Sequence, residues 1–566
     1  MRSSACGLSR EADAGVGQKR SPEGEGPPPP RIDAMSSGAP SFYITTPIFY
    51  PSDVPHIGHG YTEVAADVLA RWHRQSGDDT WLLTGTDEHG QKMLRTATAN
   101  GMGPREWADK LVQSSWLPLL ETLDIANDDF IRTTQERHET SSQVFLQKLY
   151  DSGFIYTGDY EGFYCVGCEE YKQPSELVDG TGPYEGQRVC AIHSKPVELL
   201  HERNYFFRMS EFQDRLLALY EERPDFVQPE SARNEVMSFV RQGLDDLSIS
   251  RSSFDWGIQI PWDKDHVVYV WFEALLNYIT GIGYGRDEEQ FARRWPGIQL
   301  VGKDIVRFHA VIWPAMLMAA GLEVPKHVFA HGWLLVGGEK MSKSKLTGIA
   351  PEQITDVFGS DAFRYYFMRA ITFGQDGSFS WEDLSARYQA ELANGFGNLA
   401  SRVTAMVTRY FDGTLPEQGV PEEADLAIQR TVAEAATSAD AAIERFAIHE
   451  ALAAVWTIVE QLNGYITEQA PWVLAKDPAQ RERLGTVLYT ATEGLRALAV
   501  LLSPVIPTAT AKLWTSLGAE AAVGPLAAQP LRQAGAWGQL PAGSSITPLE
   551  ALFPRIEQDA VDGKQG

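Results

Sequence analysis

FYITTPIFYPSDVPHIGHGYTEVAADVLARWHR, residues 42–74, is the stretch that decides the fold of this chain. Its first five residues are β-branched and aromatic, which predicts a short strand. A proline-rich turn follows, and apolar residues then recur at helical spacing, which predicts a helix over about 57–74: Tyr61, Val64, Val68 and Trp72. A second apolar run at 81–84 predicts another strand. Strand, helix and strand in this order predict a parallel α/β unit with its site at the carboxyl ends of the strands.

The rest of the chain predicts an α/β fold class with a split catalytic-type domain. Apolar runs at 267–270, 299–301 and 327–330 continue the strand pattern after a stretch rich in glycine, cysteine and tyrosine. Beyond about 390 the chain is rich in alanine, leucine and glutamate at helical periods, which predicts a helical bundle. The predicted segments are a disordered tail (1–38), a Rossmann-type parallel-sheet domain in two halves (40–152 and 266–360), a connective insertion (153–265), a bridge (361–390), the bundle (391–545) and a second tail (546–566).

Composition narrows the classes of protein that need to be considered. The chain has 566 residues, 43% hydrophobic and 22% charged, which is typical of a multidomain globular protein. We expect no membrane span, no secretion signal and a cytoplasmic location, because we find neither a long apolar run nor a signal core. The four cysteines are too few for a disulfide framework. The net charge of −26 argues against binding nucleic acid by bulk charge, so any such surface must be a local basic stripe.

Two short motifs predict a site that binds ATP and transfers its α-phosphate. His56 and His59, in Pro55-His56-Ile57-Gly58-His59, fall on one face at the start of the predicted helix, where N–H groups attract phosphate. Gly58 between them permits close approach of a ligand to the backbone. Lys340 and Lys343, in Lys340-Met341-Ser342-Lys343-Ser344, can neutralise a diphosphate leaving group. Taken singly, these motifs are also compatible with capping histidines and a solvated basic turn.

A third motif predicts a metal site inside the insertion. Cys165 and Cys168 are spaced as C-x2-C, and Cys190 and His193 as C-x2-H. Three thiolates and one imidazole at this spacing are typical of a closed tetrahedral zinc site, which stabilises a fold and leaves no open position for chemistry. The alternative is three unpaired thiols in a reducing compartment.

Together the histidine and lysine motifs resemble the two signatures of class I aminoacyl-tRNA synthetases. The insertion, of about 110 residues, is too short for the editing domain carried by the synthetases for isoleucine, valine and leucine. Its cysteine motif resembles the zinc knuckle of methionyl-tRNA synthetases. The resemblance covers about residues 40–540. It implies activation of methionine with ATP and Mg2+, transfer of methionyl to the 3′-terminal adenosine of tRNA(Met), and one structural Zn2+.

The resemblance to the methionyl family also implies binding roles for individual residues. Asp87 would anchor the substrate ammonium. Gly302 and Asp304 would bind the ATP ribose. The other implied ATP-binding residues are His56, Gly58, His59 and Lys343. Aromatic faces and an imidazole suit a polarizable thioether. Leu275 stands where some relatives have proline, and Pro47-Ile48-Phe49 before Tyr50 also departs from them. The implied methionine pocket comprises Ile48, Tyr50, Asp87, Trp271, Ala274, Tyr278, Ile305 and His309. Each aromatic residue alone could instead belong to the core.

The segment 361–402 resembles the bridge into the anticodon-binding domain of the same family. By this resemblance Asn398, Arg402 and Trp472 face the CAU anticodon, consistent with RNA bases stacking on aromatic and guanidinium planes. Helix capping or bundle packing are the alternatives for each residue. We expect a monomer, because the chain ends soon after the bundle without an appended dimerisation domain. The rival functions are another class I synthetase, most plausibly cysteinyl, and an inactive tRNA-binding paralogue.

Overall fold

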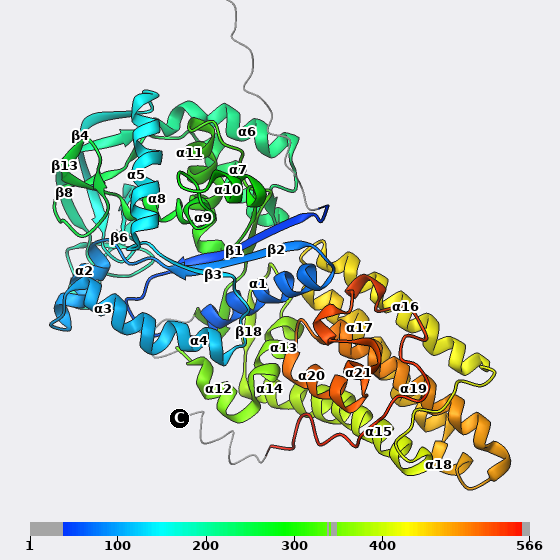
Figure 1. Cartoon of the computed structure of the whole chain (residues 1–566). Coiled ribbons are helices and arrows are strands. Elements are labelled where there is room, and N and C mark those ends of the chain that lie inside the picture. Colours follow the sequence, from blue (N-terminus) through cyan, green and yellow to red (C-terminus); the bar gives the residue numbers. More distant parts are fainter. Residues whose placement is uncertain (1–37, 337–338, 341–347, 557–566) are drawn as a thin grey trace, which may run out of the picture. The chain divides into compact units, whose positions relative to one another are not determined.

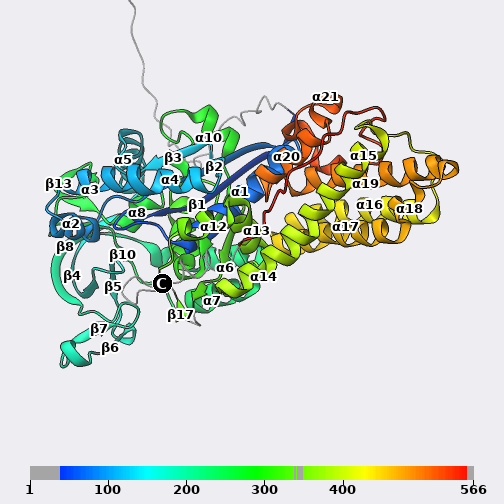
Figure 2. The same cartoon turned by 90° about the horizontal axis from the view of Figure 1, so that it is seen from below.

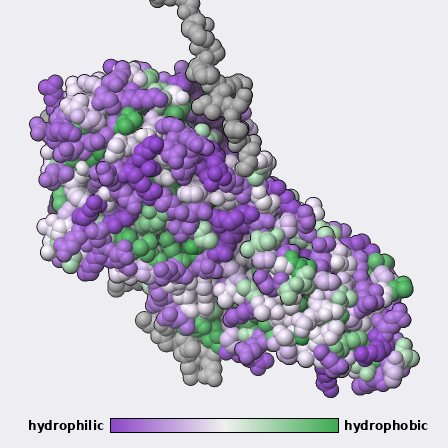
Figure 3. All heavy atoms as spheres, viewed as in Figure 1, coloured by the Kyte–Doolittle hydropathy of each residue, from purple (hydrophilic) through white to green (hydrophobic). Residues whose placement is uncertain are grey.

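A computed structural model describes residues 38–336, 339–340 and 348–556. Most of the predicted tail 1–38, the end of the tail 546–566 and Lys343 lie outside these residues. In the part of the chain that is described, no helix is long and apolar enough to cross a membrane. Hydrophilic residues cover most of the face shown in Figure 3, with smaller groups of hydrophobic residues between them.

A parallel sheet of six strands lies at the centre of the catalytic-type domain and confirms the predicted fold class (Figure 1). All five strand pairings in this sheet are parallel. The strands run across the sheet in the order β3 (Asp129–Arg132), β2 (Asp79–Thr86), β1 (Ser41–Phe49), β14 (Ile298–Gly302), β15 (His327–His331) and β9 (Val227–Gln228). The strand order reverses between β1 and β14, and open α/β sheets bind ligands at such a switch point.

The two strands at the switch point separate before β1 ends. β1 pairs with β14 at Ile44 and Thr45. Beyond Thr45 it stays with β2 alone, after a register shift that ends at Ile48. Pro47 lies within this shift and has no N–H to donate to a ladder. A crevice therefore opens between the carboxyl ends of β1 and β14.

Side chains alternate across the sheet into two separate hydrophobic cores, as expected for strands buried on both faces. Phe42 and Ile44 of β1 pack on the side of α1 (Ile57–Gln75) and α13 (Ser360–Ala370). Tyr43 of β1 packs on the opposite side, with α5 (Glu136–Asp151) and the helices that follow the insertion. α1 matches the predicted helix, and all four apolar residues used to predict it are buried.

The insertion is built mainly from antiparallel strands. β4 (Ile155–Cys165) and β8 (Glu198–Phe207) form its longest antiparallel pair. Figure 2 shows the β6–β7 hairpin projecting beside this pair. The small strands are β5 (Glu170–Lys172), β6 (Leu177–Asp179), β7 (Arg188–Cys190) and β10 (Leu247–Ser248).

Two strands differ from the prediction. The apolar run 267–270 does not join the parallel sheet. It divides between the end of β13 (Asp263–Val268), which pairs antiparallel with β11 (Ser250–Arg251) and β12 (Gln259–Ile260), and the start of α8 (Val270–Ala274). Conversely, β9 lies within the predicted insertion yet pairs with β15 in the parallel sheet. A short apolar run indicates burial but not which sheet a strand will join.

The remaining α-helices and a small sheet are as follows. Besides α1, α5, α8 and α13, the α-helices before the bundle are α2 (Gln91–Ala99), α3 (Pro104–Leu111), α4 (Leu117–Thr122), α6 (Gln213–Glu222), α7 (Glu230–Arg241), α9 (Asn277–Thr280), α10 (Glu288–Arg294), α11 (Trp313–Ala319), α12 (Pro351–Phe358) and α14 (Trp381–Arg387). The bundle comprises α15 (Asn398–Phe411), α16 (Glu423–Ile443), α17 (Ile448–Gln469), α18 (Pro471–Leu474), α19 (Arg481–Leu502), α20 (Pro507–Ser516) and α21 (Ala519–Val523). β16 (Leu334–Val336) pairs with β17 (Glu339–Lys340) and with β18 (Gly377–Phe379).

Arg364 of α13 ties the bundle to the sheet domain. Its guanidinium is fully buried and donates 2.6 Å to the Asp67 carboxylate of α1. It also donates to backbone carbonyls on both sides, those of Leu123, Pro504 and Val505. A buried charge with this many partners is costly to remove, because every partner would lose its donor.

We expect Arg364→Leu to lower the free energy of unfolding by about 3 kcal/mol or more, since it leaves buried acceptors without donors. Urea denaturation followed by circular dichroism measures this change. Arg430→Leu is the matched control, because the Arg430–Glu423 pair is exposed and should contribute less than about 1 kcal/mol. Equal effects of the two substitutions would contradict the structural role of Arg364.

Candidate functional site

The start of α1 holds the two motif histidines in fixed positions. His56 is the N-cap, and its Nδ1 accepts from Gly58 N at 3.1 Å. The His59 Nδ1 accepts from His56 N at 3.0 Å, and the two rings stack with centroids 3.9 Å apart. Because each Nδ1 accepts a backbone N–H, each neutral ring carries its proton on Nε2. The pair therefore presents two imidazole donors at a helix N-terminus, a position that suits a phosphate.

The described chain that follows the lysine motif contacts the same helix start. Ile57 N donates to the carbonyl of Ile349 at 2.9 Å, so the chain that follows the motif touches the first residue of α1. On the preceding side, the Lys340 backbone pairs with Leu335 in the β16–β17 hairpin. Lys343 lies outside the described residues.

A narrow cavity at the ends of β1 and β2 collects most of the predicted methionine residues. Six of the eight line it: Ile48, Asp87, Trp271, Ala274, Tyr278 and His309. The other two are adjacent. The Tyr50 ring meets Trp271 edge-on with centroids 6.2 Å apart, and the Ile305 carbonyl lies 2.9 Å from His309 Nδ1. Pro47, Leu275 and Asn277 complete the lining and were not predicted, since nothing in their residue type distinguishes them from core residues.

His309 is fixed as a neutral imidazole with one defined tautomer. Its Nδ1–H donates to the Ile305 carbonyl, and its Nε2 accepts from the Tyr278 hydroxyl at 2.7 Å. Burial lowers the pKa of His309 to about 4, although the bond to Ile305 acts in the opposite direction. The part of the cavity wall formed by His309 and Tyr278 is therefore polarizable and uncharged at neutral pH, which suits an apolar side chain with a soft heteroatom.

Asp87 is the charged group of this cavity and follows directly from β2. It is 2% exposed, and its Oδ1 has no hydrogen-bond partner among the described residues. Burial, and then the charges of Glu273 and Glu169, raise the pKa of Asp87 well above its ordinary value. A buried, unpaired carboxylate oxygen beside other carboxylates is a receptor for a cation.

Sequence analysis did not identify the side chains that surround Asp87. Glu88 accepts from Arg132 at 2.6 Å, and Glu273 accepts from two histidines. Glu169 accepts from the Tyr164 hydroxyl and from the backbone N–H of Lys92. Only the charged string Asp87-Glu88-His89 at a strand end could have signalled this cluster, because the other members come from distant segments.

The predicted ribose residues lie at the end of β14, across the crevice. Gly302 ends that strand, and Asp304 lies exposed in the following turn, Lys303–Ile305. A Cβ on Gly302 would come within 2.7 Å of Asp304 Oδ1, so the Asp304 carboxylate lies close to the backbone at the end of β14.

The four predicted metal ligands come together at one point of the insertion. The ligand atoms of Cys165, Cys168, Cys190 and His193 all lie within 4.8 Å of one another. The Cys168 and Cys190 sulfurs are 3.6 Å apart, close to the roughly 3.8 Å spacing that tetrahedral Zn–S bonds give. A Cβ on Gly167 would meet the His193 ring at 2.8 Å, so only glycine fits this turn. The cluster can hold a metal ion.

The cysteine and histidine cluster also contacts the cavity wall. The Trp271 indole Nε1 donates to the Cys168 carbonyl at 3.2 Å. The position of this aromatic wall therefore depends on the loop that carries two of the four metal-binding side chains.

The predicted anticodon residues lie on the bundle. Asn398 is exposed at the start of α15, with Arg402 one turn later on the same face. The Arg402 guanidinium lies 6.0 Å from the centroid of the Trp472 ring, which is 40% exposed. The structure therefore places a cation and an exposed aromatic face together at this end of the bundle, as a base-stacking surface requires.

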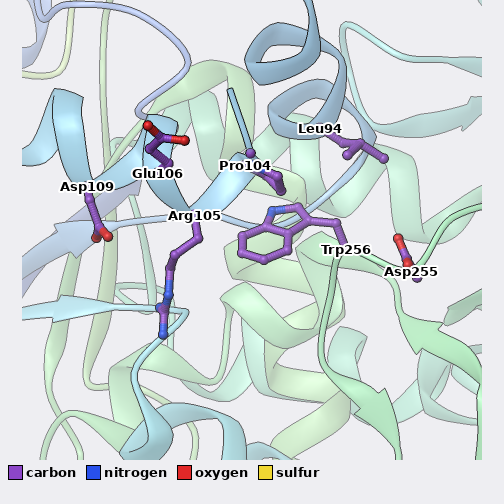
Figure 4. Close-up of a pocket in the computed structure, with 8 residues that line it drawn as sticks. Leu94, Pro104, Arg105, Glu106, Asp109, Asp255 and Trp256 are labelled. Atoms are coloured by element: carbon purple, nitrogen blue, oxygen red, sulfur yellow. The ribbon is translucent and has the colours of Figure 1, made fainter. Parts of the chain in front are cut away.

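A larger cavity of about 610 Å³ lies outside the narrow one, between α2, α3 and the segment before β12 (Figure 4). Leu94, Pro104, Arg105 and Trp256 contribute to its lining. Trp256 also reaches inward. Its Nε1 donates to the Glu88 carbonyl at 2.7 Å, and its ring contacts His89 edge-on.

Comparison with known proteins identifies the relatives of this chain. Residues 42–404 match the family model described as tRNA synthetases class I (M), and residues 415–565 match the anticodon binding domain of methionyl tRNA ligase. The chain is 61% identical to a methionine–tRNA ligase of Streptomyces coelicolor over 92% of its own length and 98% of that protein. It is 43% identical to that of Bacillus subtilis over 92% of its length and 78% of that protein.

The fold is likewise similar to solved structures. Methionyl-tRNA synthetase of Mycobacterium tuberculosis in complex with methionyl-adenylate superposes with a TM-score of 0.87 at 41% identity, over 91% of this chain and all of that one. The apo form of the Mycobacterium tuberculosis enzyme gives a TM-score of 0.79.

The buried His309 should contribute to the pH dependence of stability. Its pKa is about 4 in the folded chain and about 6.5 when unfolded, so the unfolded state binds more protons between these values. Its contribution is fully present above pH 6.5 and falls by about 3 kcal/mol as the pH decreases to 4. We expect His309→Gln to lose less stability than the wild type over this range in urea titrations at several pH values. Parallel pH profiles would contradict the assignment of a neutral buried imidazole.

Proposed function

Because the chain belongs to the class I tRNA synthetases of the methionyl type, we propose that it activates methionine with ATP and transfers it to tRNA(Met). A methionine carboxylate oxygen attacks the α-phosphorus, the α–β phosphoanhydride bond breaks, and pyrophosphate leaves. The methionyl group of the resulting adenylate then passes to the 3′-terminal adenosine of the tRNA, releasing AMP. The observation that carries this proposal is the single cavity lined by Asp87, Trp271, Tyr278 and His309 at the sheet's switch point.

The residues of this cavity divide the recognition of methionine into two parts. Asp87 binds the ammonium, because its buried Oδ1 gains a partner there. Ile48, Trp271, Ala274, Tyr278 and His309 enclose the thioether side chain, with Tyr50 and Ile305 behind them. Methionine carries its carboxylate already ionised, so no general base is needed, and orientation together with electrostatics supplies the rate.

The ATP site uses the start of α1 and the lysine motif. His56 and His59 donate Nε2–H to the phosphates and stabilise the charge that develops at the α-phosphorus. Gly58 permits close approach of the phosphate, and Gly302 and Asp304 bind the ribose. Lys340 and Lys343 neutralise the departing pyrophosphate, and Mg2+ accompanies the nucleotide as part of the substrate.

The bundle recognises the CAU anticodon through Asn398, Arg402 and Trp472. The support is the exposure of Asn398 and Trp472 and the proximity of the Arg402 cation to the Trp472 ring. This local arrangement is how a chain with a net charge of −26 binds RNA, because few positive groups are needed where bases stack.

One structural Zn2+ occupies the cluster of Cys165, Cys168, Cys190 and His193. The spacing of the ligand atoms supports it, and four protein ligands leave no open position for catalysis. We place the enzyme in the cytoplasm, where these thiols stay reduced for the metal, and propose that it acts as a monomer.

We expect ATP–pyrophosphate exchange by the purified chain with methionine alone among the twenty amino acids. Radiolabelled pyrophosphate incorporation into ATP measures it. Exchange with cysteine or another amino acid would keep the class and overturn the pocket, whereas no exchange with any amino acid would indicate an inactive tRNA-binding paralogue.

Lys343→Ala should reduce the exchange rate by about 100-fold or more, because one positive group on the leaving pyrophosphate is lost. Methionine affinity should stay within about twofold, since the proposed role of Lys343 concerns the pyrophosphate and not the amino acid. Lys345→Ala is the matched control from the same segment. Wild-type turnover in Lys343→Ala would exclude the proposed role.

Cys165→Ser should lower the zinc content, measured by atomic emission, and reduce the thermal midpoint by about 5 °C. Cys6→Ser, in the N-terminal tail, is the control and should change neither quantity. Full stability of metal-free wild-type protein after chelation would contradict a structural zinc.

A further inference from the structure

A buried carboxylate next to the ammonium site is held by two histidines. His89 Nδ1 lies 2.9 Å from Glu273 Oε1, and His138 Nε2 lies 2.8 Å from Glu273 Oε2. The three side chains come from different elements: the turn after β2, α5 and α8. Glu273 and His138 are fully buried, and His89 is 3% exposed. Thr280 completes the network at 2.8 Å from His138 Nδ1.

The network fixes the charge state of Glu273. Burial alone would raise the pKa of Glu273, but His89 and His138 more than offset this and hold it below its ordinary value. Each carboxylate oxygen has an imidazole donor, so the anion is fully hydrogen-bonded without solvent. The ionised Glu273 carboxylate is therefore held by two imidazoles inside the protein, between the cavity-lining residues Trp271 and Ala274 in the sequence.

This charge acts on Asp87. After burial, Glu273 is the strongest of the neighbouring charges that raise the Asp87 pKa. The other ionisable groups that face Asp87 are Glu88, which is paired with Arg132, and Glu169, Tyr50 and Tyr278. Charges in a buried site are weakly screened by solvent, so an incoming cation is attracted by more than Asp87 alone.

We propose that Glu273 is a positioning residue that makes the amino-acid site selective for substrates with an α-ammonium, by adding a second buried negative charge behind Asp87. The proposal rests on the proposed function, since it names the group that refines recognition in the same site. Glu273 does not line the cavity itself. Asp87 lines it, and so do Trp271 and Ala274, which lie beside Glu273 in the sequence. Its hydrogen bond to His89 also orients the loop that carries Asp87.

A purely structural role must be distinguished from this electrostatic one. If Glu273 only joins α8 to α5 and the β2 turn, its loss would disturb the whole cavity and weaken every ligand alike. If it supplies charge, its loss would weaken only ligands that carry an ammonium. Comparison of ligands that differ in this one group therefore decides between the roles.

The experiment measures dissociation constants of the full chain and of Glu273→Gln by ligand-observed NMR. L-methionine and L-methioninol carry the ammonium, and 4-(methylthio)butanoate lacks it. We expect the substitution to weaken the first two about tenfold and to leave the third unchanged within about twofold. Equal weakening of all three, or no weakening of any, would overturn the proposal.

Two variants serve as controls. Glu273→Asp keeps the charge and should retain the preference for the ammonium ligands, whatever stability it loses; loss of that preference would contradict the electrostatic role. Glu63→Gln removes a fully buried carboxylate of α1, bonded to Thr84 and outside the cavity, and should leave all three constants unchanged.

The pH profile gives a second readout. Methionine binding by the wild type should weaken as the pH falls through the raised pKa of free Asp87, and in Glu273→Gln this inflection should move to lower pH because a repelling charge is gone. An unmoved inflection would overturn the proposal.

Methionine-dependent exchange by the wild type separates failure of the proposed function from failure of the role of Glu273. Absence of exchange would reject the proposed function. Exchange in the wild type, with the same ligand selectivity in Glu273→Gln as in the wild type, would reject only the role of Glu273.

Discussion

The separation of β1 from β14 beyond Thr45 is the constraint on which the site depends. Pro47 cannot donate to a strand ladder, and the register shift that surrounds it ends at Ile48. The chain therefore leaves β14 at the position in the sheet where the strand order reverses. Ile48 lines the crevice from β1, Asp87 enters from the end of β2, and Gly302 ends the facing strand. Had β1 and β14 stayed paired to their ends, backbone hydrogen bonds would occupy the space of the ligand.

The site combines charge that is balanced with charge that is not. Glu88 is paired with Arg132, and Glu273 is stabilised by two imidazoles, so these partners offset the free-energy cost of burying the two carboxylates. Asp87 Oδ1 lacks a hydrogen-bond partner within the described chain, and Asp87 lines the cavity. The carboxylate oxygen without a hydrogen-bond partner therefore faces the cavity. The neutral His309 adds no charge to the wall.

Remote parts of the chain are mechanically connected to this cavity. The Cys168 carbonyl holds the indole of Trp271, so the metal cluster and the aromatic wall share a loop. Arg364 links α13, α1 and the segment before α20, and the core on that face continues from the sheet into the bundle. A continuous core supports a defined distance between the proposed anticodon surface and the proposed active site, since packed interiors deform little.

The sequence by itself determined the parallel α/β unit, the bundle and the local motifs. Each rests on short-range patterns: helical spacing in 57–74, two histidines at a helix start, and paired cysteine spacings. Tertiary structure alone decided which sheet the run 267–270 joins, that β9 completes the parallel sheet, and that Glu169 and Glu273 lie near Asp87. These outcomes depend on contacts between segments far apart in the chain, and a local pattern carries no information about such partners.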